Sequence, residues 1–384
     1  MLFKYLLTFV LLISFGKLLA QTDTLFKVKR PLNSRIDSLL VKNERTEKKQ
    51  GIFVMPILYY TPDTRFGFGA FGVFYFKLKN KKTQTETRLS YAKLLADYTL
   101  NRQLDIWNSW NIFLKDEKYL TKGELRYRIF PDRFYGIGNN TDEADVEKYQ
   151  YNLVSIKMLL LRKLKKNVFI GGDYQLSYVH KIQTQNEGQL NTGNITGGNG
   201  GLNSGFGAVF LIDSRDNVVN ATKGLLFEVS SYFYGKALGS DFTFNNYNIT
   251  FNQYFMIKRF TGHVLAFNTV ANFNNGNPPF LNLATVGGDE ILRGYAKNRY
   301  RDMNFVGGQA EYRLPLWWRF GLVGFVGLGD VFRSTADLSF QKLKYSYGGG
   351  LRFMVNKKER LNIRFDYGFG KQSNSFYLSI TEAF

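Results

Sequence analysis

The sequence predicts an all-β fold, a transmembrane antiparallel β-barrel of sixteen strands, and three observations carry that prediction. From Gly51 onward, apolar and polar residues alternate with a period of two, and helical periodicity is nearly absent. Aromatic residues make up 17% of the chain, and the apolar side of the alternating runs ends in Tyr and Phe, as membrane girdles do. The number of runs is even, as a closed bacterial barrel requires.

Composition excludes several classes of protein. The 384 residues contain no cysteine, which excludes a disulfide scaffold, a Cys-ligated metal and a thiol nucleophile. We find no apolar run long enough to cross a membrane as a helix. The formal net charge of +20 comes from Lys and Arg that are spread over turns and lumen-facing positions, so we expect anionic lipid headgroups, and no nucleic acid, as partners.

The N-terminal 50 residues differ from the rest. Lys4 and the apolar stretch that follows it, with Ala20 before the cleavage point, are typical of a secretory signal peptide. Residues 34–47 could form a short amphipathic helix, and a disordered linker is the alternative. We therefore expect three parts: a signal peptide at 1–20, a short periplasmic segment at 21–50, and an outer-membrane barrel at 51–384.

The alternating runs are the expected strands. They lie at residues 51–61, 65–78, 84–99, 101–115, 118–130, 149–164, 167–181, 204–213, 224–236, 241–258, 260–273, 303–314, 320–330, 344–355, 360–369 and 374–384. Most short connections follow even-numbered strands and are expected in the periplasm, whereas long ones such as 274–302 follow odd-numbered strands and are expected outside. Strand boundaries read from a sequence are imprecise, so a barrel of fourteen or eighteen strands is the alternative.

The last strand carries a terminal pattern. Phe376, Leu378, Ile380 and Phe384 fall on one face in the alternation. We expect this face to form the C-terminal strand signal, with the barrel assembly machinery as the partner for the chain's own insertion.

Several motifs occur in a fixed order along the chain. They are Phe134-Tyr135-Gly136-Ile137-Gly138-Asn139, Asp213-Ser214-Arg215-Asp216-Asn217 followed by Lys223-Gly224, Leu292-Arg293-Gly294-Tyr295, Glu311-Tyr312-Arg313-Leu314-Pro315, Phe325-Val326-Gly327-Leu328-Gly329 and the terminal Phe384. Together they resemble the motifs of the BamA/TamA superfamily of outer-membrane barrels, also called bacterial surface antigens, over about residues 51–384.

This resemblance implies an outer-membrane barrel that is not an enzyme, surrounded by outer-membrane lipids and lipopolysaccharide, with a client or passenger protein. It implies insertion or translocation of proteins without energy input, through a weak seam between the first and last strands. Residues 21–50 are too few for the family's periplasmic polypeptide-binding domains, so a barrel-only member is expected. The alternative is a passive pore or structural surface antigen whose lumen is plugged by a loop.

Arg293 is the main candidate site residue. The glycines of its long loop would let the loop fold back into the lumen, where the guanidinium needs acidic partners. In this family an acid on strand thirteen usually provides one, but here Gly327 replaces it. Strand parity points Glu311 and Asp366 inward, so they are the candidates. A watery lumen would keep the cost of losing Arg293 near 1–2 kcal/mol. The alternative is a solvated loop arginine.

Other patterns do not support catalysis or metal binding. Gly287-Gly288-Asp289-Glu290 is close to a cyclase signature, but it lies in a barrel loop. His180 and His263 have no serine in a nucleophile context. The acidic group Asp142, Glu143, Asp145 and Glu147 lacks EF-hand spacing. We therefore expect no catalytic, cofactor or metal site.

Overall fold

The computed structural model describes residues 50–61, 65–79, 86–185, 188–192, 195–357 and 359–384. The predicted signal peptide, and the predicted periplasmic segment except for Gln50, lie outside the described residues. Among the described residues, no helix has the length and apolar character needed to cross a membrane.

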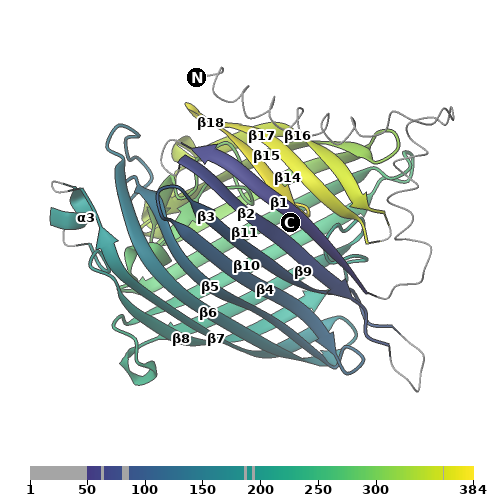
Figure 1. Cartoon of the computed structure of the whole chain (residues 1–384), viewed down its shortest axis with the longest axis horizontal. Helices are drawn as coiled ribbons and strands as arrows, with labels where there is room; N and C mark the ends of the chain where they lie inside the picture. The colour runs from purple at the N-terminus through teal and green to yellow at the C-terminus, as the bar shows by residue number, and fades with distance from the viewer. Residues whose placement is uncertain (1–49, 62–64, 80–85, 186–187, 193–194, 358) are drawn as a thin grey trace.

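Sixteen strands form one antiparallel sheet in which every strand pairs with its neighbours along the chain (Figure 1). They are β1 (Gln50–Thr61), β2 (Arg65–Phe76), β3 (Ser90–Thr99), β4 (Leu104–Leu114), β5 (Tyr119–Phe134), β6 (Glu147–Lys165), β7 (Val168–Gln183), β8 (Gly201–Asp213), β9 (Gly224–Tyr234), β10 (Phe244–Met256), β11 (Val264–Gly276), β14 (Asn304–Pro315), β15 (Phe320–Phe332), β16 (Lys344–Asn356), β17 (Leu361–Gly370) and β18 (Ser373–Ile380). The predicted fold class and strand number are confirmed.

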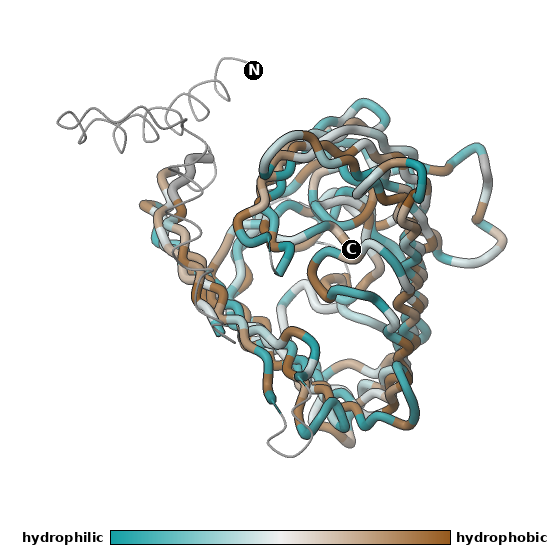
Figure 2. Tube along the Cα trace, turned by 90° about the vertical axis from the view of Figure 1, so that its right-hand side faces the viewer, coloured by the Kyte–Doolittle hydropathy of each residue, from teal (hydrophilic) through white to brown (hydrophobic). Residues whose placement is uncertain are grey.

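The alternation of the sequence becomes an inner and an outer face. On β15, the outward Val326 and Leu328 are more than half exposed, whereas Phe325 points inward and is buried. Exposed Leu, Ile, Val, Phe and Tyr side chains recur in this way on the other strands, which gives the sheet an apolar outer surface suited to lipid. The inner surface carries charged and amide side chains, and Figure 2 shows further chain segments folded inside the wall.

The connections sort by length into two ends of the barrel. One end, here called the long-loop end, carries 135–146, 184–200, 235–243, 277–303 and 333–343. The other, the turn end, carries short connections such as 166–167 and 316–319. Five connections depart from the expected pattern. At the turn end, 77–89 and 214–223 are long, and at the long-loop end the β1–β2 connection, 100–103 and 371–372 are short.

The longest connection, 277–303, contains a small hairpin that the sequence did not predict. β12 (Ala284–Val286) pairs with β13 (Tyr300–Asp302) as a separate two-stranded sheet. Strands of three residues are too short to show alternation. The hairpin packs in a buried apolar cluster with Leu292 and Tyr295 of the same loop and with Phe305 and Val331 of the wall, so the loop has a core of its own.

The chain end does not continue the outward row of β18. Phe376 and Leu378 are exposed on the outer face as expected. The strand ends at Ile380, and Thr381 has a positive φ of 79° that redirects the chain. The Phe384 ring lies 6.2 Å from the Tyr254 ring and 5.2 Å from the Arg313 guanidinium, both inside the lumen. In Figure 2 the C-terminus lies within the outline of the wall, so Phe384 departs from the face that parity predicts.

β1 and β18 are the two ends of the sheet. Within the described residues, β1 pairs along its whole length with β2, and β18 pairs with β17. The two sides approach each other at the turn end, where Asn356 Nδ2 donates to Tyr75 Oη at 2.9 Å and Lys77 lies 3.5 Å from Glu359. Side-chain contacts between the end of β2 and the β16–β17 connection therefore bridge the two sides there.

Candidate functional site

The loop arginine lies inside the barrel with two carboxylates. Arg293 Nη1 donates to Asp366 Oδ2 at 2.6 Å, and Nη2 donates to Glu311. All three side chains have no exposed surface. The guanidinium also lies 3.7 Å from the centre of the Phe325 ring, on whose face a cation is attracted. The structure therefore brings together Arg293 and both of the carboxylates expected from strand parity.

These groups belong to a larger network on β14, β16, β17 and the chain end, here called the ion clamp. Asp366 also accepts from Arg352 at 2.5 Å, and Arg352 pairs with Glu382 at 2.7 Å. Glu311 pairs with Arg313 at 2.8 Å, and Arg364 pairs with Asp289 of the loop at 2.8 Å. Four guanidinium groups thus face four carboxylates, and this balance lets the charges at the centre of the network remain buried, while Asp289 at its edge is partly exposed.

The tip of the 277–303 loop, formed by Arg293, Gly294 and Tyr295 and here called the loop tip, rests directly on the backbone of β17. A Cβ on Gly368 would lie 2.6 Å from the Arg293 carbonyl oxygen, and one on Gly370 would lie 2.6 Å from the Tyr295 ring. Gly294 has φ +124°, a conformation open to glycine, and it too touches the β17 backbone. Gly368 and Gly370 were not singled out from the sequence, although glycines two apart in a strand mark a close backbone approach.

Hydrogen bonds fix the tip from β16 and from the last hairpin. Gly294 N donates to Tyr377 Oη at 2.9 Å, and Tyr377 Oη donates to the Tyr295 carbonyl at 2.8 Å. Tyr295 Oη donates to the Tyr345 carbonyl at 2.9 Å and accepts from Lys371 N at 2.9 Å. Tyr377 and Lys371 were not singled out from the sequence, because their roles depend on where the loop ends.

Two features differ from the sequence expectation. The centre of the ion clamp, formed by Arg293, Glu311 and Asp366, has no exposed side-chain surface, so removing Arg293 should cost about 3–5 kcal/mol, the range for an orphaned buried ion, rather than 1–2 kcal/mol. Gly327 does not leave a gap, because a Cβ there would meet Leu292 at 3.2 Å and Gln309 at 3.3 Å. The apolar residue before Arg293 thus occupies the space above Gly327, and the acids lie on β14 and β17.

The second predicted motif forms a strap, defined as residues 214–223 between β8 and β9. Asp213 receives two parallel bonds from Arg215, at 2.9 and 3.1 Å, which fix the start of the strap. Asp216 accepts from Thr222 N at 2.8 Å and from Arg360 Nη1 at 2.6 Å. Gly224 has φ +95°, and a Cβ there would meet the Ser214 carbonyl at 2.3 Å.

The strap crosses the turn end of the lumen to the opposite part of the sheet. Asn217 Nδ2 donates to the Glu359 carbonyl at 3.3 Å, and Glu382 N donates to the Val219 carbonyl at 3.5 Å. Ala221 is buried in a cluster with Tyr254, and Phe384 packs against that cluster. The strap motif and the chain end, read separately in the sequence, therefore meet in one place.

The patterns set aside in the sequence have structural partners. Asp289 of the cyclase-like run receives Arg364. The His180 ring stacks on Tyr178 at 4.7 Å, and His263 Nδ1 lies 2.7 Å from Tyr312 Oη. Glu147 accepts the backbone N–H groups of Gln189 and Leu190. In the part of the chain that the structure describes, no three His, Cys, Asp or Glu side chains are grouped to hold a metal ion.

A sixteen-stranded antiparallel sheet with an apolar outer face and a loop held inside it defines a transmembrane β-barrel. A profile of the Omp85 superfamily domain matches residues 63–384, and the chain belongs to this superfamily. Its members are outer-membrane proteins.

Solved structures support the same fold. The chain is similar to BamA from Haemophilus ducreyi lacking POTRA domains 1-3, with 13% identity and a TM-score of 0.53 over 87% of this chain and 70% of that chain. It is also similar to CdiB from Acinetobacter baumannii, with 12% identity and a TM-score of 0.51 over 87% of this chain and 60% of that chain. Comparison with curated proteins finds no match.

Proposed function

We propose that this barrel inserts or translocates proteins at the outer membrane without energy input, through the seam between β1 and β18. The observation that carries the proposal is the pairing order of the sheet, which ends at these two strands, with side-chain contacts at the turn end. An edge strand offers free N–H and C=O groups to an incoming strand, so a client could extend the sheet there. The long-loop end then faces outward and the turn end faces the periplasm.

The ion clamp supports this proposal by holding one side of the seam. The loop tip is bonded to Tyr377 and Ser373 of β18, which keeps that strand in position. β1 has no comparable attachment among its described residues. A seam with one anchored and one less constrained strand suits exchange of backbone bonds with a client.

Cross-linking across the seam tests the proposal. The sequence contains no natural cysteine, so only the introduced thiols react with the cross-linker. Val54→Cys with Leu378→Cys places thiols on outward positions of β1 and β18, for a bismaleimide with a cleavable spacer. The matched control is Ile52→Cys with Phe74→Cys, which face each other across β1 and β2. The measurement is the folding rate of a urea-unfolded eight-stranded barrel in liposomes, followed by heat-modifiable migration.

We expect the unlinked protein to accelerate folding of the eight-stranded barrel. Linking the seam should abolish this acceleration, and cleaving the linker should restore it. The control link should have no effect. Equal acceleration with the seam linked or free would overturn the role of the seam. Absence of any acceleration would overturn the insertion function.

The second candidate is a passive pore with a loop-plugged lumen, and it rests on the same buried loop. It predicts a single-channel conductance in planar bilayers that rises when the loop is released by Arg293→Ala, together with no acceleration of client folding. A conductance that stays low in that variant would overturn this candidate.

A further inference from the structure

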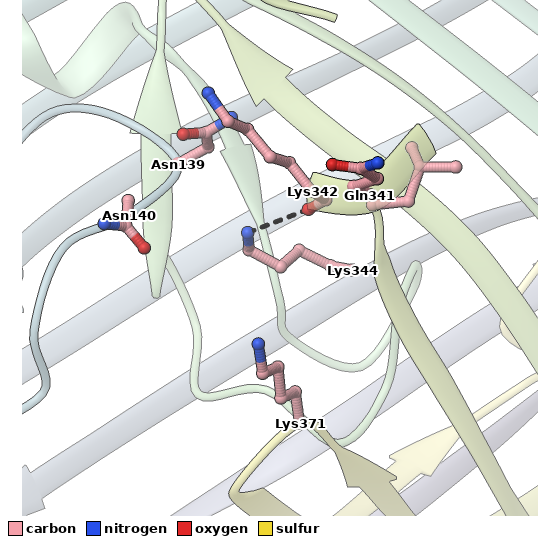
Figure 3. Close-up of a pocket in the computed structure, with 7 residues that line it drawn as sticks. Asn139, Asn140, Gln341, Lys342, Lys344 and Lys371 are labelled. Carbon is pink, nitrogen blue, oxygen red and sulfur yellow. Dashed lines mark hydrogen bonds between the residues drawn. The ribbon is translucent and has the colours of Figure 1, made fainter. Parts of the chain in front are cut away.

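A polar cavity opens at the long-loop end, between the 135–146 loop, the start of β16 and the β17–β18 turn. Its volume is about 230 Å³, and its lining includes Asn139, Asn140, Lys342, Lys344 and Lys371 (Figure 3). None of the described residues that line it is acidic. Figure 3 shows the amines of Lys344 and Lys371 directed into the same space, with the Asn140 amide opposite them.

The charges around this cavity do not balance. Asp330 lies behind the lining, 3.7 Å from Lys344, and accepts from Asn139 at 3.0 Å. Asp337 is the carboxylate that interacts with Lys342. No carboxylate within hydrogen-bond distance of Lys371 is found among the described residues, and Lys371 interacts unfavourably with the like charge of Lys344. An anion between these two amines would remove that repulsion.

Lys344 is held in place by the protein, which distinguishes this cavity from a group of mobile surface lysines. Its side chain is 10% exposed, its amine donates to the Lys342 carbonyl at 3.1 Å, and the amine lies 4.6 Å from the Tyr300 ring centre. The Lys344 ammonium has three N–H donors, but its protein partners are one carbonyl oxygen and one more distant carboxylate. It can therefore donate a further hydrogen bond into the cavity. The Asn140 amide adds further donors from the other side.

From this geometry we infer that the cavity binds a phosphoryl group, either as free phosphate or at the end of a phosphorylated saccharide. A phosphoryl group offers three or more acceptor oxygens to the amines and the amide. The volume is below the ~300–1,000 Å³ of pockets that enclose a whole ligand, so it suits one anionic group rather than a complete headgroup. Lys344 faces the lumen, so the anion enters from the long-loop side and not from the lipid-facing wall.

The site is connected to the ion clamp through backbone atoms. Lys371 N donates to Tyr295 Oη, which donates to the carbonyl of Tyr345, the residue after Lys344. The two elements that contribute the amines are therefore those that grip the loop tip. A bound phosphoryl group bridges them and stabilises the gripped state by mass action.

The test is titration calorimetry of the purified barrel in detergent with inorganic phosphate, with sodium chloride at equal ionic strength as the comparison. Lys371→Gln is the principal variant because Lys371 is exposed and the substitution leaves the wall intact. Lys236→Gln, an exposed lysine of the 235–243 loop, is the matched control. We expect phosphate binding that chloride does not reproduce, a dissociation constant raised at least tenfold in Lys371→Gln, and an unchanged one in Lys236→Gln.

A hexose phosphate and the same hexose without phosphate identify the source. Tighter binding of the hexose phosphate than of phosphate assigns the site to phosphorylated surface saccharides, and equal binding assigns it to free phosphate. Binding of the unphosphorylated hexose alone, binding of phosphate that is the same in Lys371→Gln, or no binding of either phosphate compound overturns the inference. Heat-modifiable migration verifies that each variant is folded.

Discussion

The C-terminal and N-terminal parts of the sheet are built from the same alternating pattern but are held in different ways. β14 to β18 are tied to the inserted loop by the ion clamp, with Arg293, Glu311 and Asp366 fully buried. Among the described side chains of β1 and β2, only Val73 is a buried side chain, and the outward residues of β1 reach 70% exposure at Ile52. Alternation alone therefore produces a strand. We expect the resistance of that strand to separation from the sheet to depend on the side chains and loops that pack on its inner face.

The strongest test of this contrast removes the centre of the ion clamp. Arg293→Ala leaves Glu311 and Asp366 buried without their shared partner, and we expect a loss of about 3–5 kcal/mol in the free energy of unfolding. Urea titration in detergent, followed by tryptophan fluorescence, measures it. Arg333→Ala, in an exposed position of the 333–343 loop, is the control and should change stability by less than about 0.5 kcal/mol. Equal losses in the two variants would contradict a buried clamp.

A second experiment ranks the two carboxylates. Asp366 contacts Arg293, Arg352 and Arg364, whereas Glu311 contacts Arg293 and Arg313. Asp366→Asn should therefore destabilise the barrel more than Glu311→Gln, each at or below the ~3–5 kcal/mol of a broken buried pair. A double-mutant cycle of each with Arg293→Lys measures the coupling. The reverse order would place the main anchor on β14 instead of β17.

A third experiment displaces the loop without changing charge. Gly368→Ala puts a methyl group where the Arg293 carbonyl lies, and overpacking of this kind costs about 1–3 kcal/mol. We expect raised conductance in planar bilayers as the tip leaves β17. Gly324→Ala is the matched control, because a Cβ there meets nothing within 4 Å. Identical conductance in both variants would mean that the tip does not seal the lumen.

The smallest expected effect concerns the strap. Burial acts to raise the pKa of Asp216, but hydrogen bonds from Arg360, Thr222 and Lys223 outweigh it and hold the pKa below its usual range. The stabilisation is therefore complete above the unfolded value of about 3.9 and is lost as pH falls through the lower folded pKa. Arg360 is partly exposed, so Asp216→Asn should cost about 0.2–1 kcal/mol at pH 7. Stability curves of the variant and the parent should converge at acid pH; a constant gap would show that charge is not involved.

The sequence allowed the wall to be predicted more fully than its contents. Strand positions follow from a period of two, and inward Glu311 and Asp366 follow from the same parity. The hairpin β12–β13 and the burial of the ion clamp could not be predicted, because they depend on how a loop of 27 residues packs in three dimensions. The direction of Phe384 depends on one positive φ at Thr381, where the alternation gives no signal.

The strap has a mechanical consequence. β8 and β9 are the middle strands of the sheet, and the strap binds them to the 357–360 turn and to the chain end. That connection crosses the interior of the barrel and links the middle of the sheet to its C-terminal strands. The same turn reaches the base of β2 through Asn356 and Glu359. If the β1–β2 hairpin moved outward, these contacts would hold it at the turn end. The displacement would therefore be largest at the long-loop end.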